Sequence, residues 1–370
     1  PCEMCIRDRS ETAGNLALGA DALAWDSYQT AFLIGKELRA IGVNMNYAPT
    51  VDVYVNPEAH VIGPRAFGSD AKQVAWLGLA SFAGYRDSRV IATAKHFPGL
   101  GDASGDSHGL MPLLTEQIDT LWNRDFLPYR LLIPEGLPAI LIGHLAFPAI
   151  SGDQMPASLS PALNRKLLRD KLSFEGIVIT DDLFMGGASV YASTQGWGMS
   201  DIVIAAIVAG NDIIMMSRTP DLQDPIWLKV QARYRSDPGF RNMVQAAVRR
   251  SLLVKLAYLK PDNRVPLRPD PATVYRAVPD PAAADFFRNQ AGRAVSILAS
   301  KRIPFQPASG SRMALIGQDG DFLRAAQSIW PKAETLRYGN EPFFRAEAAT
   351  IAQAQALAQR SDWILFCLAN

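Results

Sequence analysis

Residues 176–182 read GIVITDD: a run of β-branched side chains ends directly in two carboxylates. Such a run is typical of a strand that is buried on both faces, because β-branched residues pack well on a pleated surface. Strands of this kind predict a parallel sheet with helices on both faces. Three other apolar stretches have polar or sulfur-containing residues at or near their carboxyl ends: VIATAKHF (90–97), PAILIGHL (138–145) and DIIMM (212–216).

Segments with the periodicity of a helix lie between these strands. A further strand is expected within VNMNYAPTVDV (43–53). The alternation predicts an α/β fold, a (β/α)8 barrel of the TIM type that lacks its first strands. A doubly wound sheet is the alternative, although no GxGxxG opens a helix after the first strand. The predicted helices are 21–41, 71–86, 116–133, 160–172 and 201–210.

Composition divides the chain into four parts. Residues 1–9 are expected to be non-native, because EMCIRD resembles a translated sequencing adapter, so the C-x-x-C formed by Cys2 and Cys5 is set aside. The catalytic barrel is expected over 10–260, a proline-rich linker over 261–282 and the start of a second α/β domain over 283–370. Both ends look cut, so the chain is expected to be a fragment.

The bulk properties exclude some classes of partner. The chain has 370 residues and a formal net charge of +1, which gives no electrostatic reason to expect nucleic acid. No apolar run of ~18 residues is present, so no membrane-spanning segment is expected. These properties do not indicate the oligomeric state.

Polar residues at the strand ends are the candidate site residues, because the carboxyl ends of parallel barrel strands form one face. Asp181 can face the barrel mouth as a nucleophile, and Asp182, which points the other way in a continuing strand, is expected to be structural. Lys95 and His96 are donors suited to a hydroxyl-bearing ligand; a buried ion pair is the alternative for Lys95. For His144 binding and structural roles remain open.

Two loops add further candidates. Arg65, in IGPRAFGSD (62–70), either binds substrate or anchors its loop. His108 follows Asp106 by two residues, so in an extended segment both lie on one side and the carboxylate can fix the imidazole tautomer. Glycines around them are expected to let this loop move. An exposed turn with an incidental histidine is the alternative.

Together these motifs resemble glycoside hydrolase family 3, in its β-N-acetylglucosaminidase (β-N-acetylhexosaminidase) branch. The segment KHFPGLGDASGDSHGLMP (95–112) is similar to the family signature KHFPGxGDxxxDSHxxLP. The resemblance covers about residues 14–260, and the second domain resembles, more weakly, the family's α/β sandwich domain. Further matching blocks are IGVNMNYAPTVDV (41–53), IGPRAFGSD (62–70), FEGIVITDDLFMGGA (174–188) and AGNDIIMM (209–216).

The resemblance implies a retaining exo-β-N-acetylglucosaminidase that acts on peptidoglycan-derived or chitin-type glycans and needs no metal or cofactor. Asp181 would be the nucleophile, His108 the general acid/base and Asp106 its partner. The sugar would be bound by Lys95, His96 and Arg65, with His144 as a further candidate. By analogy, a second domain favours an extracytoplasmic enzyme slightly over a cytoplasmic one.

Three alternatives remain. A phosphorylase is the nearest, because a neutral imidazole base does not repel a phosphate acceptor. A metal-dependent barrel hydrolase would use His96, His108, His144 and Asp181, although no H-x-H is present. An inactive sugar-binding protein is disfavoured by the intact Asp181, Asp106 and His108.

Overall fold

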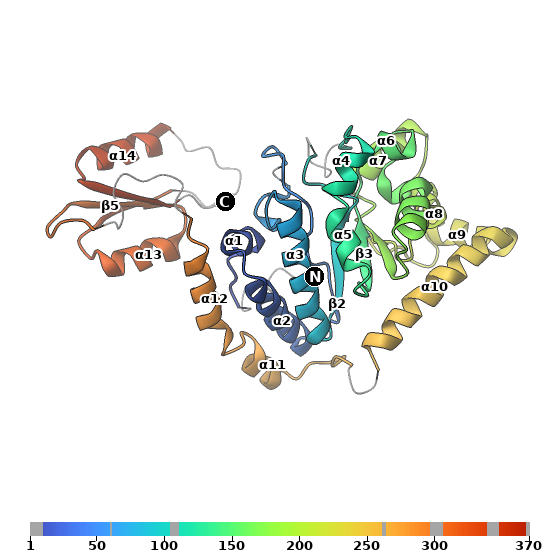
Figure 1. Cartoon of the computed structure of the whole chain (residues 1–370), viewed down its shortest axis with the longest axis horizontal. Coiled ribbons are helices and arrows are strands. Elements are labelled where there is room, and N and C mark those ends of the chain that lie inside the picture. The colour runs from blue at the N-terminus through green and yellow to red at the C-terminus, as the bar shows by residue number, and fades with distance from the viewer. Residues whose placement is uncertain are drawn as a thin grey trace. The chain divides into compact units, whose positions relative to one another are not determined.

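The computed structural model describes residues 10–59, 61–103, 111–260, 264–296, 306–338 and 348–367 (Figure 1). The chain forms two compact units, residues 1–296 and 297–370. The first unit extends beyond the compositional boundary at 283, because helix α12 (Ala283–Arg293) packs on α1 (Asn15–Asp21) and α2 (Ala24–Ala40). Residues 1–9, with Cys2 and Cys5, lie outside the described residues.

A parallel sheet forms the centre of the first unit. Its strands are β1 (Met45–Asn46), β2 (Ile91–Phe97), β3 (Ala139–Ile142) and β4 (Ile177–Thr180), and their spatial order equals their order in the chain. A parallel bridge between Ile179 and Ile213 continues the sheet beyond β4. The expected α/β class is confirmed, and the sheet is open across the described part of the chain.

Most predicted helices are present with shifted ends. The segment 116–133 forms two short helices, because Pro128 can occupy the first turn of a new helix but not the interior of a continuous one. Segment 160–172 is wound as a π-helix, and the strand expected within 43–53 is only the two-residue β1. Besides α1 and α2, the helical elements before residue 260 are α3 (Ala71–Asp87), α4 (Ile118–Asn123), α5 (Leu127–Leu132), α6 (Pro148–Ser151), η4 (Ala162–Lys171), α7 (Gly186–Thr194), α8 (Met199–Ala209), α9 (Pro225–Ser236) and α10 (Pro238–Tyr258), with 3₁₀ turns η2 (Gly63–Arg65) and η3 (Ala157–Leu159).

Aromatic packing fixes the carboxyl end of β2. Phe97, the last residue of that strand, lies edge-on to Tyr129 with ring centroids 5.1 Å apart and stacks on Phe126 at 6.0 Å. All three rings are fully buried. Burial of an aromatic side chain contributes about 1.5–3 kcal/mol, so these contacts hold the strand end that contains the candidate residues Lys95 and His96.

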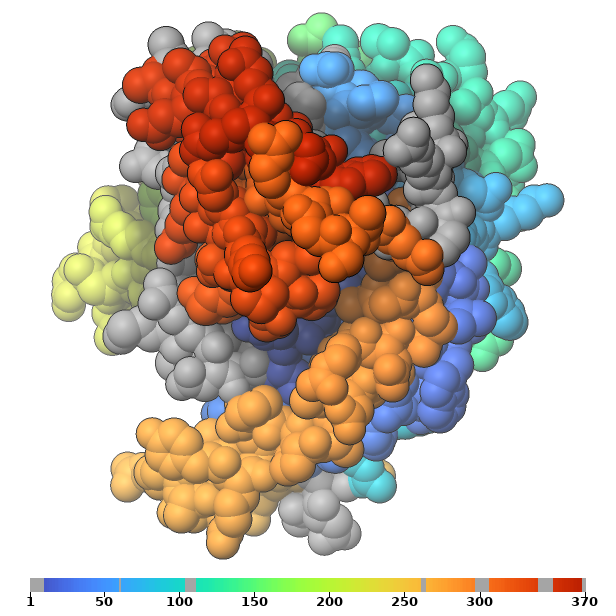
Figure 2. Space-filling model, turned by 90° about the vertical axis from the view of Figure 1, so that its left-hand side faces the viewer, coloured from blue at the N-terminus to red at the C-terminus, as the bar shows by residue number. Residues whose placement is uncertain are grey.

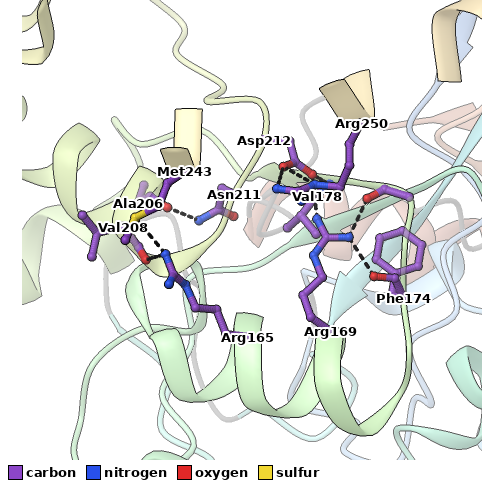
Figure 3. Close-up of polar contacts among 11 residues, drawn as sticks. Arg165, Arg169, Phe174, Val178, Ala206, Val208, Asn211, Asp212, Met243 and Arg250 are labelled. Carbon is purple, nitrogen blue, oxygen red and sulfur yellow. Dashed lines mark hydrogen bonds and ion pairs between the residues drawn. The ribbon is translucent and has the colours of Figure 1, made fainter. Parts of the chain in front are cut away.

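A cluster of ion pairs lies at the amino ends of the strands, opposite to the carboxyl ends where the candidate residues lie (Figure 3). The fully buried Asp212 carboxylate accepts from Arg169 Nη2 of η4 and from Arg250 Nη2 of α10, both at 2.7 Å. The same carboxylate accepts the Val178 backbone N–H of β4 at 2.8 Å. One side chain therefore ties two helices to the sheet, away from the carboxyl ends of the strands.

The segment after α10 returns across the first unit. Helix α11 (Pro271–Ala277) packs on α2, and Lys36 Nζ of α2 pairs with Asp280 at 2.6 Å. Figure 2 shows this segment in orange against the blue N-terminal helices. The stretch predicted as a linker therefore belongs to unit 1, and α11 within it packs on the N-terminal helix α2.

The second unit is a small parallel α/β sheet. Its strands are ordered β6 (Glu334–Arg337), β5 (Met313–Gly317) and β7 (Trp363–Cys367), and its helices are α13 (Gly320–Ile329) and α14 (Ala348–Gln359). No helix within the described ranges is long and apolar enough to cross a membrane.

Candidate active site

Four of the residues predicted from strand ends and loops line one cavity of about 130 Å³ at the carboxyl ends of the strands. They are Arg65, Lys95, His96 and Asp181. Their sequence separation spans more than one βα unit, so the parallel sheet brings them together. The remaining lining residues are Tyr47, Val61, Leu100, Leu141, Met185 and Met215.

Asp181 follows β4 directly and is held by the backbone. Its N–H donates to the Ile142 carbonyl at 2.8 Å, and its Oδ1 accepts the Asp182 N–H at 2.9 Å. Asp182 turns away and accepts the N–H groups of Phe184 and Ser217, both at 3.0 Å. The structural role expected for Asp182 is confirmed, while Asp181 faces the cavity.

Lys95 and His96 are consecutive in β2, yet both line the cavity. The pairing of β2 with β3 shifts register between Ala94 and Phe97, which breaks the regular alternation of side chains there. The Lys95–His96 peptide bond is cis. A regular strand would direct only one of the two side chains to this side.

The ammonium group of Lys95 lies in an environment that disfavours its charge. Burial, followed by the nearby Arg65 cation, lowers the pKa of Lys95 to about 8, although the carboxylates of Asp181 and Asp52 act in the opposite direction. Lys95 is therefore mostly a cation at neutral pH and close to its titration range. A cation here can donate to sugar hydroxyls and neutralise part of the charge of Asp181.

His96 lies between a carboxylate and a guanidinium. Its Nδ1 is 2.8 Å from Asp52 Oδ2, and its Nε2 is 3.3 Å from Arg65 Nη2. Asp52 also accepts the Leu100 N–H at 2.7 Å and the His96 N–H at 3.2 Å. Burial acts to raise the pKa of Asp52, but His96 and these N–H donors outweigh it and lower the pKa below its ordinary value.

His144 is placed differently from the other candidates. It is buried, its Nδ1 is 2.7 Å from Ser158 Oγ, and its Nε2 is 2.9 Å from the Asp182 carbonyl oxygen. Burial lowers the pKa of His144, although the Asp181 charge acts against it, so the ring is neutral. Both nitrogens are used within the protein, and the geometry favours the structural role that the sequence left open.

The loop after β2 is tightly packed over its described part. Gly99 has a φ of +137°, and a β-carbon there would lie 2.9 Å from Asp125 Cβ; one on Gly101 would lie 2.0 Å from the Val53 carbonyl oxygen. These two glycines therefore permit close approach of the backbone to its neighbours. Gly105 and Gly109, which flank the predicted acid/base pair, lie outside the described residues, so the expected role of glycines in loop movement stays a prediction. Asp106 and His108 lie outside the described residues, so the acid/base pair remains a prediction.

Two further ion pairs fasten the same loop. Arg124 Nη2 pairs with Asp102 at 2.8 Å, and Arg124 Nε pairs with Asp125 at 2.8 Å. Burial raises the pKa of Asp125 to about 6, although Arg124 acts against it. Arg124 therefore links Asp102 of the loop to Asp125, the residue against which Gly99 packs.

Tyr47 is a cavity residue that the sequence analysis did not single out. Tyr47 follows β1 directly, and the other candidates were also chosen because they follow predicted strands. The sequence predicted a strand within 43–53, so the actual end of β1 at Asn46 was not recognised. Burial, and then the charge of Asp181, raise the pKa of Tyr47. Its hydroxyl is thus a neutral donor on the wall that contains the carboxylate.

The metal-dependent alternative requires a cluster of ligands. Across residues 10–59, 61–103, 111–260, 264–296, 306–338 and 348–367, no group of three or more His, Cys, Asp and Glu side chains is arranged to hold a metal ion. His108, one of the four residues named for that alternative, lies outside these ranges.

Residues 6–232 match the family model described as the glycosyl hydrolase family 3 N terminal domain. The chain belongs to glycosyl hydrolase family 3. A β-hexosaminidase of Thiobacillus denitrificans is 35% identical over 202 residues, which are 55% of this chain and 54% of that protein. A β-hexosaminidase of Methylococcus capsulatus is 34% identical over 252 residues, 67% of this chain and 70% of that protein.

A solved structure shows the same fold in the same family. The family 3 β-N-acetylglucosaminidase from Paenibacillus sp. superposes with a TM-score of 0.81 at 26% identity, and the match covers 97% of this chain and 68% of that one. The chain spans about half the length of the Thiobacillus relative. Membership of the family is consistent with the parallel α/β barrel architecture inferred from the strand–helix alternation.

Proposed function

We propose that this protein is a retaining exo-β-N-acetylglucosaminidase that releases terminal β-linked N-acetylhexosamine from peptidoglycan-derived or chitin-type glycans. The observation that carries the proposal is the convergence of Asp181, Lys95 and Arg65 on one cavity at the carboxyl ends of the strands. The family 3 relatives named as β-hexosaminidases support the substrate class.

The size of the cavity supports cleavage at the end of a glycan. Its volume of about 130 Å³ is below the ~300–1,000 Å³ of ordinary ligand pockets. A site of this size favours one terminal sugar over several internal ones. Lys95 and Arg65 supply N–H donors for the hydroxyls of that sugar, and Tyr47 supplies an O–H.

The proposed reaction has two steps. A carboxylate oxygen of Asp181 attacks the anomeric carbon while His108 gives its proton to the departing glycosidic oxygen, so the C–O bond to the leaving sugar breaks and a glycosyl ester forms. Water then attacks the same carbon, His108 takes its proton, and the ester bond to Asp181 breaks. Asp106 would stabilise the imidazolium form of His108.

Hydrolysis of 4-nitrophenyl N-acetyl-β-glucosaminide tests the proposal, with the 370-residue chain and with the gene product that includes any flanking sequence. Asp181→Ala should lower kcat by at least ~10³-fold, because covalent catalysis is lost. The matched control is Asp170→Asn on an exposed position. Undiminished turnover by Asp181→Ala, or an inverted anomer as first product by NMR, would refute the mechanism.

A phosphorylase is the second candidate. Two cations, Lys95 and Arg65, line the cavity, and a neutral imidazole would not repel an incoming phosphate. Analysis of the products with and without inorganic phosphate separates the two activities: a sugar 1-phosphate indicates a phosphorylase, and free sugar at an unchanged rate indicates a hydrolase.

A further inference from the structure

We propose that Asp52 is a positioning residue that acts on substrate through His96 and Arg65. The three side chains form a continuous hydrogen-bonded series, the Asp52–His96–Arg65 chain, which ends at the cavity. The inference rests on the proposed function, because it concerns how a sugar-binding guanidinium is held in place.

The partners of the His96 ring indicate which of its nitrogens carries a hydrogen. An ionised carboxylate only accepts hydrogen bonds, so the Nδ1 atom 2.8 Å from Asp52 carries the hydrogen. A guanidinium only donates, so the Nε2 atom 3.3 Å from Arg65 presents its lone pair. The two contacts thus place the ring hydrogen on Nδ1, because a hydrogen on Nε2 would face an N–H of Arg65.

Burial makes the first link of the chain firm. The Asp52 side chain is 0% exposed and the His96 side chain is 6% exposed, so neither group can exchange its partner for water. Asp52 is also fixed by the Leu100 N–H at 2.7 Å, and Leu100 is itself part of the cavity wall. The carboxylate therefore holds the imidazole in one orientation.

Arg65 depends on that orientation. It lies on an exposed turn, where its Nη1 donates to the Val61 carbonyl at 3.0 Å and its Nη2 donates to His96. These contacts occupy one N–H of each terminal nitrogen and leave others for a ligand. His96 thus positions Arg65 with its only remaining ring nitrogen, and Arg65 contacts the sugar.

A double-mutant cycle on KM tests the chain with 4-nitrophenyl N-acetyl-β-glucosaminide. Asp52→Asn keeps the shape of the side chain but allows its amide to donate, which permits the Nε2–H tautomer that opposes Arg65. We expect KM to rise ~10–100-fold with kcat changed less than ~3-fold, as for the loss of a charge-assisted hydrogen bond used in uniform binding. Arg65→Ala should raise KM similarly.

The double variant distinguishes positioning from a general structural effect. If Asp52 acts through Arg65, Asp52→Asn in the Arg65→Ala background should change KM by less than ~2-fold. If the KM of the double variant rises by the product of the two single-variant increases, the inference is overturned. Asp212→Asn is the matched control: it alters an equally buried aspartate at the other end of the strands, and it should lower Tm while leaving KM unchanged.

A measurement on the wild-type protein covers the case in which Asp52→Asn does not fold. The wild-type protein labelled with ¹⁵N-histidine should show His96 as the neutral Nδ1–H tautomer near pH 7, assigned against His96→Gln. An Nε2–H tautomer or an imidazolium would overturn the inference. If the wild-type protein does not turn over the glycoside, that result would count against the proposed function. The tautomer of His96 would still test the hydrogen bonds of the Asp52–His96–Arg65 chain.

Discussion

Gly99 lies directly against Asp125, so close that a β-carbon on the glycine would be 2.9 Å from the aspartate Cβ. Gly99 also has a φ of +137°, a backbone conformation that residues other than glycine rarely adopt. Asp125 is buried and bonded to Arg124, so it cannot move aside easily. The contact joins the loop after β2 to the segment between α4 and α5.

Gly99→Ala should therefore destabilise the protein by about 2–4 kcal/mol, through crowding added to backbone strain. The control is Gly136→Ala, where φ is +86° but nothing lies within 4 Å of the new carbon, and strain alone of about 1 kcal/mol is expected. Urea unfolding of both variants measures the difference. Equal losses would show that Asp125 yields without cost.

Lys95 should set the alkaline limit of activity. If sugar binding requires the ammonium, kcat/KM falls as pH rises through about 8, the pKa to which burial and Arg65 lower Lys95. Lys95→Arg should move this limb beyond pH 9, because a guanidinium does not titrate there. A pH–rate profile of both proteins checks this, and an unmoved limb in Lys95→Arg would assign it to another group.

The titration of Lys95 should also affect stability. The free energy of unfolding should rise with pH over the range in which activity falls. The pKa falls from 10.5 in the unfolded chain to about 8 in the folded one, so the unfolded chain binds more protons between these values. The free energy of unfolding should therefore rise as pH increases from about 8 to 10.5. Lys95→Met should be inactive yet more stable at pH 7 by about 3 kcal/mol, measured by denaturant unfolding. Lower stability in Lys95→Met would contradict the burial cost.

Removal of the Asp212 carboxylate should separate stability from catalysis. Asp212→Ala leaves Arg169 and Arg250 without their shared partner, which costs about 3–5 kcal/mol for a buried pair. Calorimetric Tm should fall, while KM of the folded fraction stays at the wild-type value because the cluster lies away from the cavity. A changed KM would reveal coupling between the two ends of the sheet.

Tyr47→Phe should test the hydroxyl beside Asp181. The ring and its packing remain, so the loss is limited to one hydrogen bond, about 3–10-fold in kcat/KM. Tyr47→Ala removes the wall as well and should cost more. Identical values for wild type and Tyr47→Phe would mean that the hydroxyl does not meet the substrate.

The strand ends could be predicted from the sequence because apolar runs stop abruptly at Lys95 and Asp181. The parallel sheet then requires that these ends meet. Tyr47 was missed because its strand is two residues long and has no apolar run to mark its end. The packing role of Gly99 could not be predicted, since it depends on Asp125, a residue from another part of the chain.

His144 shows a different limit. His144 lies two residues after the apolar strand β3, but its ring nitrogens contact Ser158 and the Asp182 carbonyl. The direction of a side chain at a strand end depends on the local register. Residue type and position alone cannot distinguish a ligand-facing histidine from one that braces a neighbouring loop.

The register shift between Ala94 and Phe97 has a consequence for engineering. A Lys-His dipeptide transplanted into a straight strand of another barrel would direct one donor into the site and the other into the helical layer. A functional graft would have to include the irregular backbone from both β2 and β3. The transferable unit is therefore a pair of strand ends in a defined offset, and a search for similar sites should compare backbone paths before residue types.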